Sequence, residues 1–537
     1  MARASVDYVA RFAALALAAA VAGCGGGGGD AAGGGAGPPT GGPPASGWTA
    51  GSFLPASSFA GRCVNPRTGT NPQTGQPYNE TRGTATDENN FLRSWSNDLY
   101  LWYNEIVDRD PSLHTTPAYF DLLVTPAKTA SGADKDRFHF TYETSDWLAL
   151  QQSGTEAGYG VVWSVVANLP PRRIVVAYTQ PNSPAVTANL QRGEEILRID
   201  GVDVVNSNTQ AEVDTFVAGL YPDQPNQSHS FRVRNPTTGA QRDVIMVSAN
   251  VAIDPVQSER TISTPTGLVG YVHFTDHLPI SEQQLIDAFA SFAQQGVTDM
   301  VLDLRYNGGG LLAIASEVAY MIAGNVPTSG QTFEQLQFND KHRSINPVTG
   351  GPLAPMPFFN ASSTGQPLPT LNLSRVFVLT GSMTCSASES IVNGLRGVNV
   401  QVIQIGSTTC GKPYGFYPTD NCGTTYFTIQ FQGVNAKGFG SYGDGFTAQN
   451  TTVPGAERLP GCSVRDDFTR PLGDPVEQRL AAAMQYRQSQ TCPAPSGVSP
   501  AGSPDFSKPF NQQPARGATD GVVAKSPWLS NRILERP

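Results

Sequence analysis

The C-terminal half of the chain alternates short apolar strands with helix-like segments, and this alternation limits the possible folds more than any other feature. Between about 264 and 487, apolar runs such as MVLDL (300–304) and VFVL (376–379) are each followed by a turn and a helical pattern. Strands that alternate with helices form a mixed sheet with helices packed on its faces. We therefore predict a layered α/β domain over residues 260–490.

The remaining length leaves room for further domains, because 537 residues exceed what one hydrophobic core usually serves. An amphipathic helix, within a small helical domain at 85–150, is predicted by large apolar residues at spacings of three and four: Leu92, Trp95, Leu99 and Trp102. Short apolar strands separated by turn residues then predict a β domain at 155–255. The last helix of the α/β domain is predicted to follow Asp474 as N-cap.

The first 24 residues have the features of an export signal. Arg3 and Arg11 precede an apolar, alanine-rich run, 12–22, that is too short to span a bilayer comfortably. The run ends in Val-Ala-Gly-Cys24, which resembles the lipobox of bacterial lipoproteins, where the cysteine is lipidated; an ordinary signal peptide is the alternative. We expect an exported protein anchored through Cys24, on the outer membrane facing the periplasm or the cell surface.

Two segments of biased composition flank the folded part. Residues 25–47 are almost entirely Gly, Ala and Pro, which predicts a flexible linker. Residues 493–537 are rich in Pro, Ser and Gly, which predicts an irregular C-terminal tail. The 44 acidic and 35 basic side chains give a net charge of −9, so no binding of nucleic acid is expected.

Six cysteines remain after Cys24, at positions 63, 385, 410, 422, 462 and 492. An even number of cysteines in an exported chain indicates disulfides. Sequence spacing favours Cys410 with Cys422 and Cys462 with Cys492, which leaves Cys63 with Cys385, although other connectivities are open. A zinc site is the alternative, but no CxxC pair or nearby histidine pair accompanies the cysteines.

Residues 183–201 resemble part of a PDZ domain, through Ser-Pro-Ala at 183–185, Leu190 and the segment GEEILRIDG at 193–201. Upstream, the residues Gly158, Tyr159, Gly160 and Val161 resemble the loop in which such domains hold a peptide's terminal carboxylate on backbone N–H groups. The bound peptide adds a strand to the edge of the sheet. The resemblance implies that these four residues bind peptide, and the alternative is a PDZ fold that serves only as a hinge or plug.

Three segments follow in a specific order. Residues 303–310 (DLRYNGGG) resemble the DLRxNxGG segment of the C-terminal processing peptidases, also called tail-specific proteases, of family S41. Residues 384–389 (TCSASE) resemble their (S/T)ASASE segment, and 406–412 (GSTTCGK) resembles the segment that carries their lysine. Each segment alone is a weak signal, but the ordered set is specific, and with the PDZ-like part the resemblance covers about 158–487.

The family resemblance implies a ClpP/crotonase-like layered core with a preceding or inserted PDZ-like domain. It also implies roles for individual residues: Ser386 is the nucleophile and Lys412 is the base. The backbone N–H groups of Gly309, with its neighbour Gly310, and of Ala387 are the expected donors to the oxyanion. The family chemistry requires no metal or organic cofactor.

These residue types suit acyl transfer. A serine hydroxyl is a poor nucleophile until a base removes its proton. Ser386 follows a buried strand and opens a helix, which would place its oxygen near backbone donors and the positive end of the helix dipole. A lysine can act as a base only when it is uncharged, and burial among apolar groups lowers its pKa.

Several alternatives stay open at this point. Ser388 lies one alternation from Ser386, so the register decides which hydroxyl faces the cleft. Ser386 and Glu389 also form a Ser-x-x-Glu capping box that needs no catalytic role. His273 is an alternative base, because some relatives use a histidine from this part of the fold. The family often has glutamine four residues after its lysine, where this chain has Phe416.

The sequence therefore predicts a tethered serine endopeptidase that captures protein or peptide substrates by their C-terminal tails and cleaves them through an acyl-enzyme. The competing hypothesis is a catalytically inactive lipoprotein scaffold that only binds peptides. A long insertion at 327–369 is a candidate lid over the site. The sequence does not indicate an oligomeric state.

Overall fold

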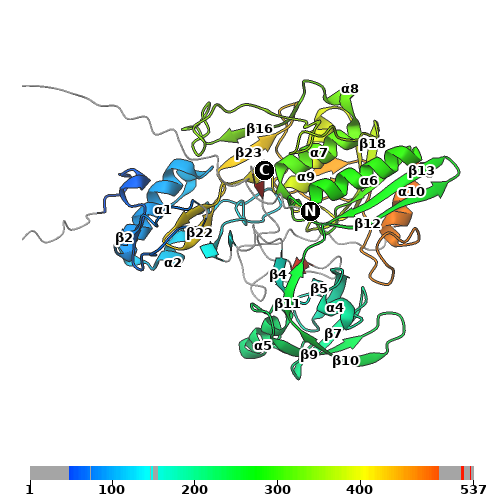
Figure 1. Ribbon diagram of the computed structural model, residues 1–537, viewed down its shortest axis with the longest axis horizontal. Helices are drawn as coiled ribbons and strands as arrows, with labels where there is room; N and C mark the ends of the chain where they lie inside the picture. The colour runs from blue at the N-terminus through cyan, green and yellow to red at the C-terminus, as the bar shows by residue number, and fades with distance from the viewer. Residues whose placement is uncertain are drawn as a thin grey trace, which may run out of the picture. The chain divides into compact units, whose positions relative to one another are not determined.

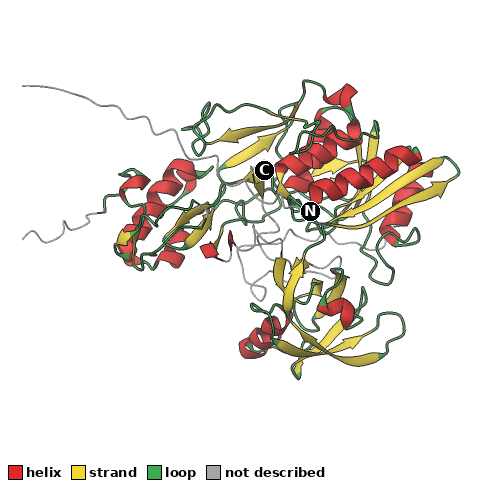
Figure 2. Cartoon of the chain, viewed as in Figure 1, coloured by secondary structure: helices red, strands yellow, loops and turns green. Residues whose placement is uncertain are grey.

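The computed structural model describes residues 48–494, except 73, 146 and 149–154, together with two short strands at 522–524 and 532–533. The predicted signal peptide (1–24), its Cys24 and the linker (25–47) lie outside the described residues. None of the helices in the described part of the chain is both long and apolar enough to cross a bilayer. The architecture is mixed α/β with several domains, which confirms the predicted fold class (Figure 2).

The core region, residues 260–490, is built on a six-stranded sheet with the strand order β12-β13-β14-β18-β19-β26. Its strands are β12 (Val256–Thr264), β13 (Gly267–Phe274), β14 (Asp299–Asp303), β18 (Arg375–Thr380), β19 (Gln401–Gly406) and β26 (Gly461–Cys462). β12 pairs with β13 in antiparallel fashion, and every later pair is parallel. The carboxyl ends of the parallel strands therefore meet at one edge of the sheet, from which the loops that bear polar side chains begin.

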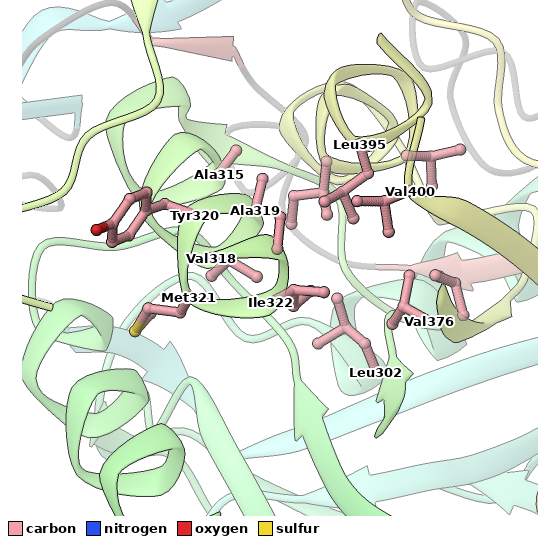
Figure 3. Packing of buried hydrophobic residues seen from close by; sticks show 14 of the residues in the cluster. Leu302, Ala315, Val318, Ala319, Tyr320, Met321, Ile322, Val376, Leu395 and Val400 are labelled. Carbon is pink, nitrogen blue, oxygen red and sulfur yellow. The ribbon is translucent and has the colours of Figure 1, made fainter. Parts of the chain in front are cut away.

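Helices cover both faces of this sheet. On one face lie α6 (Ser281–Gln295), α7 (Leu312–Ala323) and α9 (Ala387–Gly397), and on the other lies α10 (Gln478–Ser489) (Figure 1). Every residue of α7 is buried, because α6, α9 and the sheet surround it. Figure 3 shows Ile322 of α7 gathered with Leu302 of β14, Val376 of β18 and Leu395 of α9. The apolar strands and helix faces of the sequence thus meet in one core.

The region predicted to be PDZ-like, residues 155–255 and called the PDZ-like region below, forms a second sheet with the strand order β10-β9-β7-β6-β5, in which β8 also pairs with β7. A strand of the C-terminal tail, β27 (Val522–Ala524), is added at its edge. Its elements are β5 (Val161–Ala167), β6 (Arg173–Thr179), α4 (Pro184–Thr187), β7 (Glu195–Ile199), β8 (Val202–Asp203), α5 (Gln210–Leu220), β9 (Ser228–Arg234) and β10 (Gln241–Val247). Trp163, Ile196 and Phe231 lie in a hydrophobic cluster of this region alone. The pair β4 (Thr155–Gly158) and β11 (Ala249–Ala252) leads into and out of it.

The strand β27 (Val522–Ala524) comes from the C-terminal tail and pairs with β5. A second tail strand, β28 (Arg532–Ile533), pairs with β15 (Gly310–Leu311) of the core region. The tail that composition predicts to be irregular therefore contains two short strands, each formed by pairing with a strand elsewhere in the chain.

The N-terminal region contains the helices α1 (Ala85–Leu99) and α2 (Thr116–Phe120), and its strand β3 (Phe140–Glu143) pairs with β22 (Thr424–Phe427). β22 also pairs with β21 (Thr419–Asn421), and two further pairs are β1 (Arg62–Cys63) with β2 (Thr81–Arg82) and β24 (Phe446–Ala448) with β25 (Glu457–Leu459).

Tyr100 and Phe138 share a hydrophobic cluster with Cys410 and Phe416 of the core region. The segments that follow α1 and α2 are therefore packed against the lysine-bearing loop.

Two predicted helix limits are wrong. The predicted apolar stripe extends to Trp102, but α1 ends at Leu99, because Tyr100 has an extended backbone. The last helix begins at Gln478 and not after Asp474, because the side chain of Glu477 acts as its N-cap.

The insertion at 327–369 contains the end of α8 (Asn325–Thr328), β16 (Thr332–Phe338) and β17 (Met356–Pro357). β16 pairs with β23 (Phe431–Val434), which in turn pairs with β20 (Tyr414–Gly415). Phe358 and Leu368 of the insertion are buried in the same cluster as α7. The insertion is thus packed on the core and linked through a sheet to the residues that follow Lys412.

Three disulfides join Cys63 to Cys422, Cys385 to Cys410 and Cys462 to Cys492. The last pair agrees with the prediction, and the other two predicted pairs are wrong. The loop after β19 returns to the turn after β18, which brings Cys410 to Cys385, whereas the β21–β22 hairpin carries Cys422 to the N-terminal region. There, Gly61 N–H donates to Asn421 Oδ1 at 3.0 Å. Since all six cysteines are bridged, none of them is a thiolate ligand for zinc.

Candidate active site

Ser386 lies in the turn between β18 and α9, at the carboxyl end of a parallel strand. Its backbone has φ 59° and ψ −117°, which side-chain-bearing residues rarely adopt. Its side chain is fully buried, and its hydroxyl has no hydrogen-bond partner among the described residues. A strained backbone and an unpaired buried hydroxyl both cost free energy, and such features cluster at functional sites.

Ser388 differs from Ser386 in its contacts. The Ser388 hydroxyl donates to the carbonyl oxygen of Asn307 at 3.1 Å, which fastens α9 to the glycine-rich turn. The glutamate half of the capping box is formed, since Ser386 N–H donates to Glu389 Oε2 at 3.0 Å. Of the two serines, Ser386 is therefore the better candidate for the nucleophile, because its hydroxyl is not engaged by another described residue.

Lys412 is buried, with 1% of its surface exposed, and its Nζ lies 4.7 Å from the ring centroid of Phe416 and 4.9 Å from that of Phe138. Burial lowers the pKa of Lys412 to about 7, against the opposing effect of the negative charges of Asp136 and Glu389. A large fraction of the amine is therefore uncharged near neutral pH. Phe416, at the position where the resembling family often has glutamine, is one wall of this apolar pocket.

Glu389 connects the turn of Ser386 to the loop of Lys412. Its Oε2 accepts hydrogen bonds from the backbone N–H of Ser386 at 3.0 Å and from that of Lys412 at 2.8 Å. Its Oε1 accepts from Gly411 N–H at 2.9 Å, and burial raises the pKa of its carboxyl. The disulfide between Cys385 and Cys410 joins the same turn and loop covalently. Sequence reasoning treated Glu389 only as a helix cap, because its contact with the lysine loop is made across the fold.

The glycine-rich turn lies against Ser386. Gly309 has φ 105°, and a Cβ on it would lie 2.8 Å from Ser386 Cβ and 2.9 Å from Ala387 N, so a side chain has no room there. The N–H of Gly309 donates to Asn307 Oδ1 at 2.9 Å. One of the predicted oxyanion donors is thus engaged within the turn, and the other two predicted donors are the N–H groups of Gly310 and Ala387.

The two histidines of β13 and its following loop have different surroundings. The ring of His273 lies edge-on to Tyr178, at 5.4 Å between centroids, and to Tyr306, at 6.0 Å. His277 instead contacts the glycine-rich turn. Its ring Nδ1 is 3.0 Å from Asn307 Oδ1, and its backbone N–H donates to the carbonyl oxygen of Gly309. The structure therefore packs the predicted alternative base, His273, among tyrosines.

A buried ionic cluster surrounds Arg305, in the segment that leads into the glycine-rich turn. Arg305 pairs with Asp303, Asp466 and Glu477, at 3.0, 2.7 and 2.9 Å. Although burial alone would lower the pKa of Arg305, the three carboxylates hold it well above its ordinary value. Arg192 of the PDZ-like region also pairs with Asp466, at 2.6 Å. The cluster thus ties the PDZ-like region to the strand that leads into the glycine-rich turn.

The predicted peptide-binding residues Gly158, Tyr159, Gly160 and Val161 all line one cavity of about 120 Å³. Gly160 has φ 70°, and a Cβ on it would lie 2.4 Å from Ser183 Cβ, so the loop requires glycine. The hydroxyls of Tyr159 and Tyr221, which also line the cavity, are buried without a hydrogen-bond partner in the described part of the chain. The cavity is therefore formed by the residues that the sequence predicts to bind peptide.

Residues 268–417 match the sequence profile of Peptidase family S41. A carboxyl-terminal-processing protease of Picosynechococcus sp. is 26% identical over 266 residues, which cover 49% of this chain and 56% of that protein. Carboxyl-terminal-processing peptidase 1, chloroplastic, of Arabidopsis thaliana is 24% identical over 311 residues, or 57% of this chain and 54% of that protein. The chain thus spans about half the length of the curated relatives it matches.

A solved structure from Bacteroides fragilis, named provisionally as an S41 protease, aligns with a TM-score of 0.55 and 22% identity. The alignment covers 75% of this chain and 97% of that one, and it shows that the two share a fold. Together, the profile and the relatives support homology with C-terminal processing proteases of family S41.

Proposed function

We propose that this chain is a serine endopeptidase with Ser386 as its nucleophile and Lys412 as its base. The observation that carries the proposal is the state of Lys412, which is buried against two aromatic rings with a pKa of about 7. Its backbone shares one carboxylate oxygen of Glu389 with the backbone of Ser386. The homology with peptidases over residues 268–417 supports the same chemistry.

The reaction proceeds through an acyl-enzyme. Oγ of Ser386 attacks the carbonyl carbon of the scissile peptide bond, and its proton passes to Nζ of Lys412. Backbone N–H groups of the glycine-rich turn and of Ala387 donate to the negative oxygen. When the C–N bond breaks, Lys412 returns the proton to the leaving nitrogen. Water then attacks the ester by the same route, which releases the new carboxyl end and restores Ser386.

The substrates are proteins or peptides with accessible C-terminal tails. The terminal carboxylate binds in the cavity at Gly158–Val161, and the residues before it add a strand to β5. The cavity that residues 158–161 line and the glycine that the loop requires at position 160 support this placement.

The protein acts outside the cytoplasm as a lipoprotein, anchored to a membrane through a lipidated Cys24. Three disulfides support this location, because such bonds persist in oxidising compartments. Labelling with a radioactive fatty acid tests the anchor: the parent incorporates label and the Cys24→Ala variant does not.

The peptidase proposal is tested with protein that lacks residues 1–47 and an unstructured protein substrate. The parent cleaves the substrate, Ser386→Ala abolishes cleavage without change in thermal unfolding, and the control variant Ser329→Ala, at an exposed serine, retains cleavage. If the parent and Ser386→Ala bind peptide equally well and neither cleaves, the chain is a peptide-binding scaffold and the proposal is wrong.

A further inference from the structure

We propose that the C-terminal tail of this chain occupies the peptide-binding edge of its own PDZ-like region and crosses its own active site, which keeps the enzyme closed until a substrate peptide displaces the tail. This inference rests on the proposed peptide capture at β5. It concerns the backbone pairing of the two tail strands, β27 and β28 (Figure 1, red).

The first contact is at the edge of the PDZ-like sheet. β27 pairs antiparallel with β5, with Val522 opposite Val165 and Ala524 opposite Trp163. The other neighbour of β5 is β6, so β27 fills the edge that a captured peptide would extend. β27 and an external peptide therefore compete for the same backbone groups.

The second contact is at the glycine-rich turn. β28 pairs in parallel with β15, with Arg532 opposite Gly310. On the other side of the turn, the backbone N–H of His277 donates to the carbonyl oxygen of Gly309 at 3.1 Å. The carbonyl oxygen of His277 accepts from the N–H of Leu311 at 3.0 Å. Because the hydrogen-bonding groups of a strand alternate in direction, the ladder with β28 uses the N–H and carbonyl of Gly310 itself. An expected oxyanion donor is thereby engaged by the tail.

The same tail strand also lies beside β20, which begins at Tyr414, two residues after Lys412. β28 therefore runs between the glycine-rich turn and the lysine loop. Ser386, between these two segments in the proposed mechanism, is fully buried. An external peptide bond reaches Ser386 only when this arrangement opens.

The order of the two contacts along the chain distinguishes blocking from capture. A tail held by its terminal carboxylate presents residues that precede its end to the nucleophile. Here the strand at the glycine-rich turn, 532–533, follows the strand on β5, 522–524. The tail therefore crosses the two sites in the order opposite to that of a captured substrate, as expected for a blocking segment.

The block is reversible on physical grounds. Strands of three and two residues make few hydrogen bonds, and short strands without packing are weak. The covalent link compensates, because a tethered segment competes at an effective concentration on the order of millimolar. Substrate peptides that bind well at β5 are the ones able to displace it.

The test compares the chain that ends at residue 517 with the full-length chain. Without the tail, kcat/KM for an unstructured substrate rises about tenfold or more. A fluorescent peptide of residues 518–537 binds the truncated Ser386→Ala variant about tenfold more tightly than the full-length Ser386→Ala variant, measured by anisotropy. The second measurement does not depend on catalysis.

A full-length variant guards against misfolding of the truncated chain. Val522→Pro with Val523→Pro removes two successive backbone N–H groups, of which one must face β5. This variant gains activity and peptide affinity as the truncation does, whereas the matched control, Gln512→Pro with Gln513→Pro, behaves as the parent.

The outcomes separate the two proposals. Equal peptide binding with and without the tail, or lower activity after truncation, overturns the inference about the tail. Tighter peptide binding after truncation with no cleavage by any variant supports the tail contact and overturns the peptidase proposal. Equal cleavage by the full-length chain, the truncated chain and the proline variant supports the peptidase proposal and overturns the inference about the tail.

Discussion

Lys412 and Arg305 are two buried cations of the same region, and their surroundings are opposite. Lys412 faces the rings of Phe416 and Phe138, and burial lowers its pKa to about 7. Arg305 is surrounded by three carboxylates at hydrogen-bonding distance, which hold its pKa well above the ordinary value. Equal burial therefore leads to opposite protonation behaviour.

The difference shows that the partners of a buried cation, and not its depth, decide its role. The cost of desolvation acts on both side chains. Three paired carboxylates offset this cost for Arg305, which then fixes structure, whereas for Lys412 the effect of burial exceeds that of the negative charges of Asp136 and Glu389. Lys412 is left able to exchange a proton, and Arg305 is not.

The largest expected effect follows from giving the lysine pocket a cation that cannot lose its proton. Lys412→Arg keeps a positive charge at neutral pH and cannot act as a base, so kcat/KM falls about 10³–10⁴-fold. The exposed Lys128→Arg is the matched control and leaves kcat/KM unchanged. Full activity of Lys412→Arg would show that another group, such as His273, is the base.

The next effect concerns stability. Arg305→Met leaves the buried carboxylates of Asp303 and Glu477 without their cation, while Asp466 keeps Arg192, so the free energy of unfolding falls by about 3–5 kcal/mol in urea denaturation. Arg232 forms an exposed pair with Asp243, so Arg232→Met leaves the free energy of unfolding nearly unchanged. Similar losses for the two variants would mean that the buried cluster is not a special support.

A smaller effect is the pH dependence of cleavage. Since the pKa of Lys412 is about 7, the uncharged amine falls about tenfold for each pH unit well below that value and approaches its maximum above it. We expect kcat/KM to rise with pH and to level off above about pH 8. A profile that is flat between pH 5.5 and 8 contradicts the assignment of Lys412 as base.

The smallest effect tests the aromatic wall. Phe416→Gln places a polar amide beside Nζ and reduces its desolvation, so the pKa of Lys412 rises toward its ordinary value. The midpoint of the pH profile then shifts upward by up to about one unit. Thermal unfolding of the same samples controls for loss of structure, and a downward shift would show that Phe416 does not set the pKa.

Sequence reasoning predicted the strands of the core region well, because buried strands such as β14 and β18 are continuous apolar runs. It also selected the segments that carry Ser386, Lys412 and the glycine-rich turn, because their order matched a family pattern. The strained backbone of Ser386 and the pKa of Lys412 depend on packing from distant segments, so no local pattern could supply them.

Long-range contacts explain the errors. Cys63 and Cys422 are 359 residues apart, and sequence spacing cannot favour such a pair over a nearby one. Glu477 caps α10 while its carboxylate pairs with Arg305, a contact across 172 residues that moves the start of the helix. Spacing rules fail where two segments meet through tertiary structure.

The bridge between Cys63 and Cys422 closes most of the described chain into a covalent ring. A single cut in any surface loop within that ring opens the ring but releases no fragment. A molecule that is cut once in such a loop thus remains one covalent unit, whose two pieces separate only when the bridge is reduced.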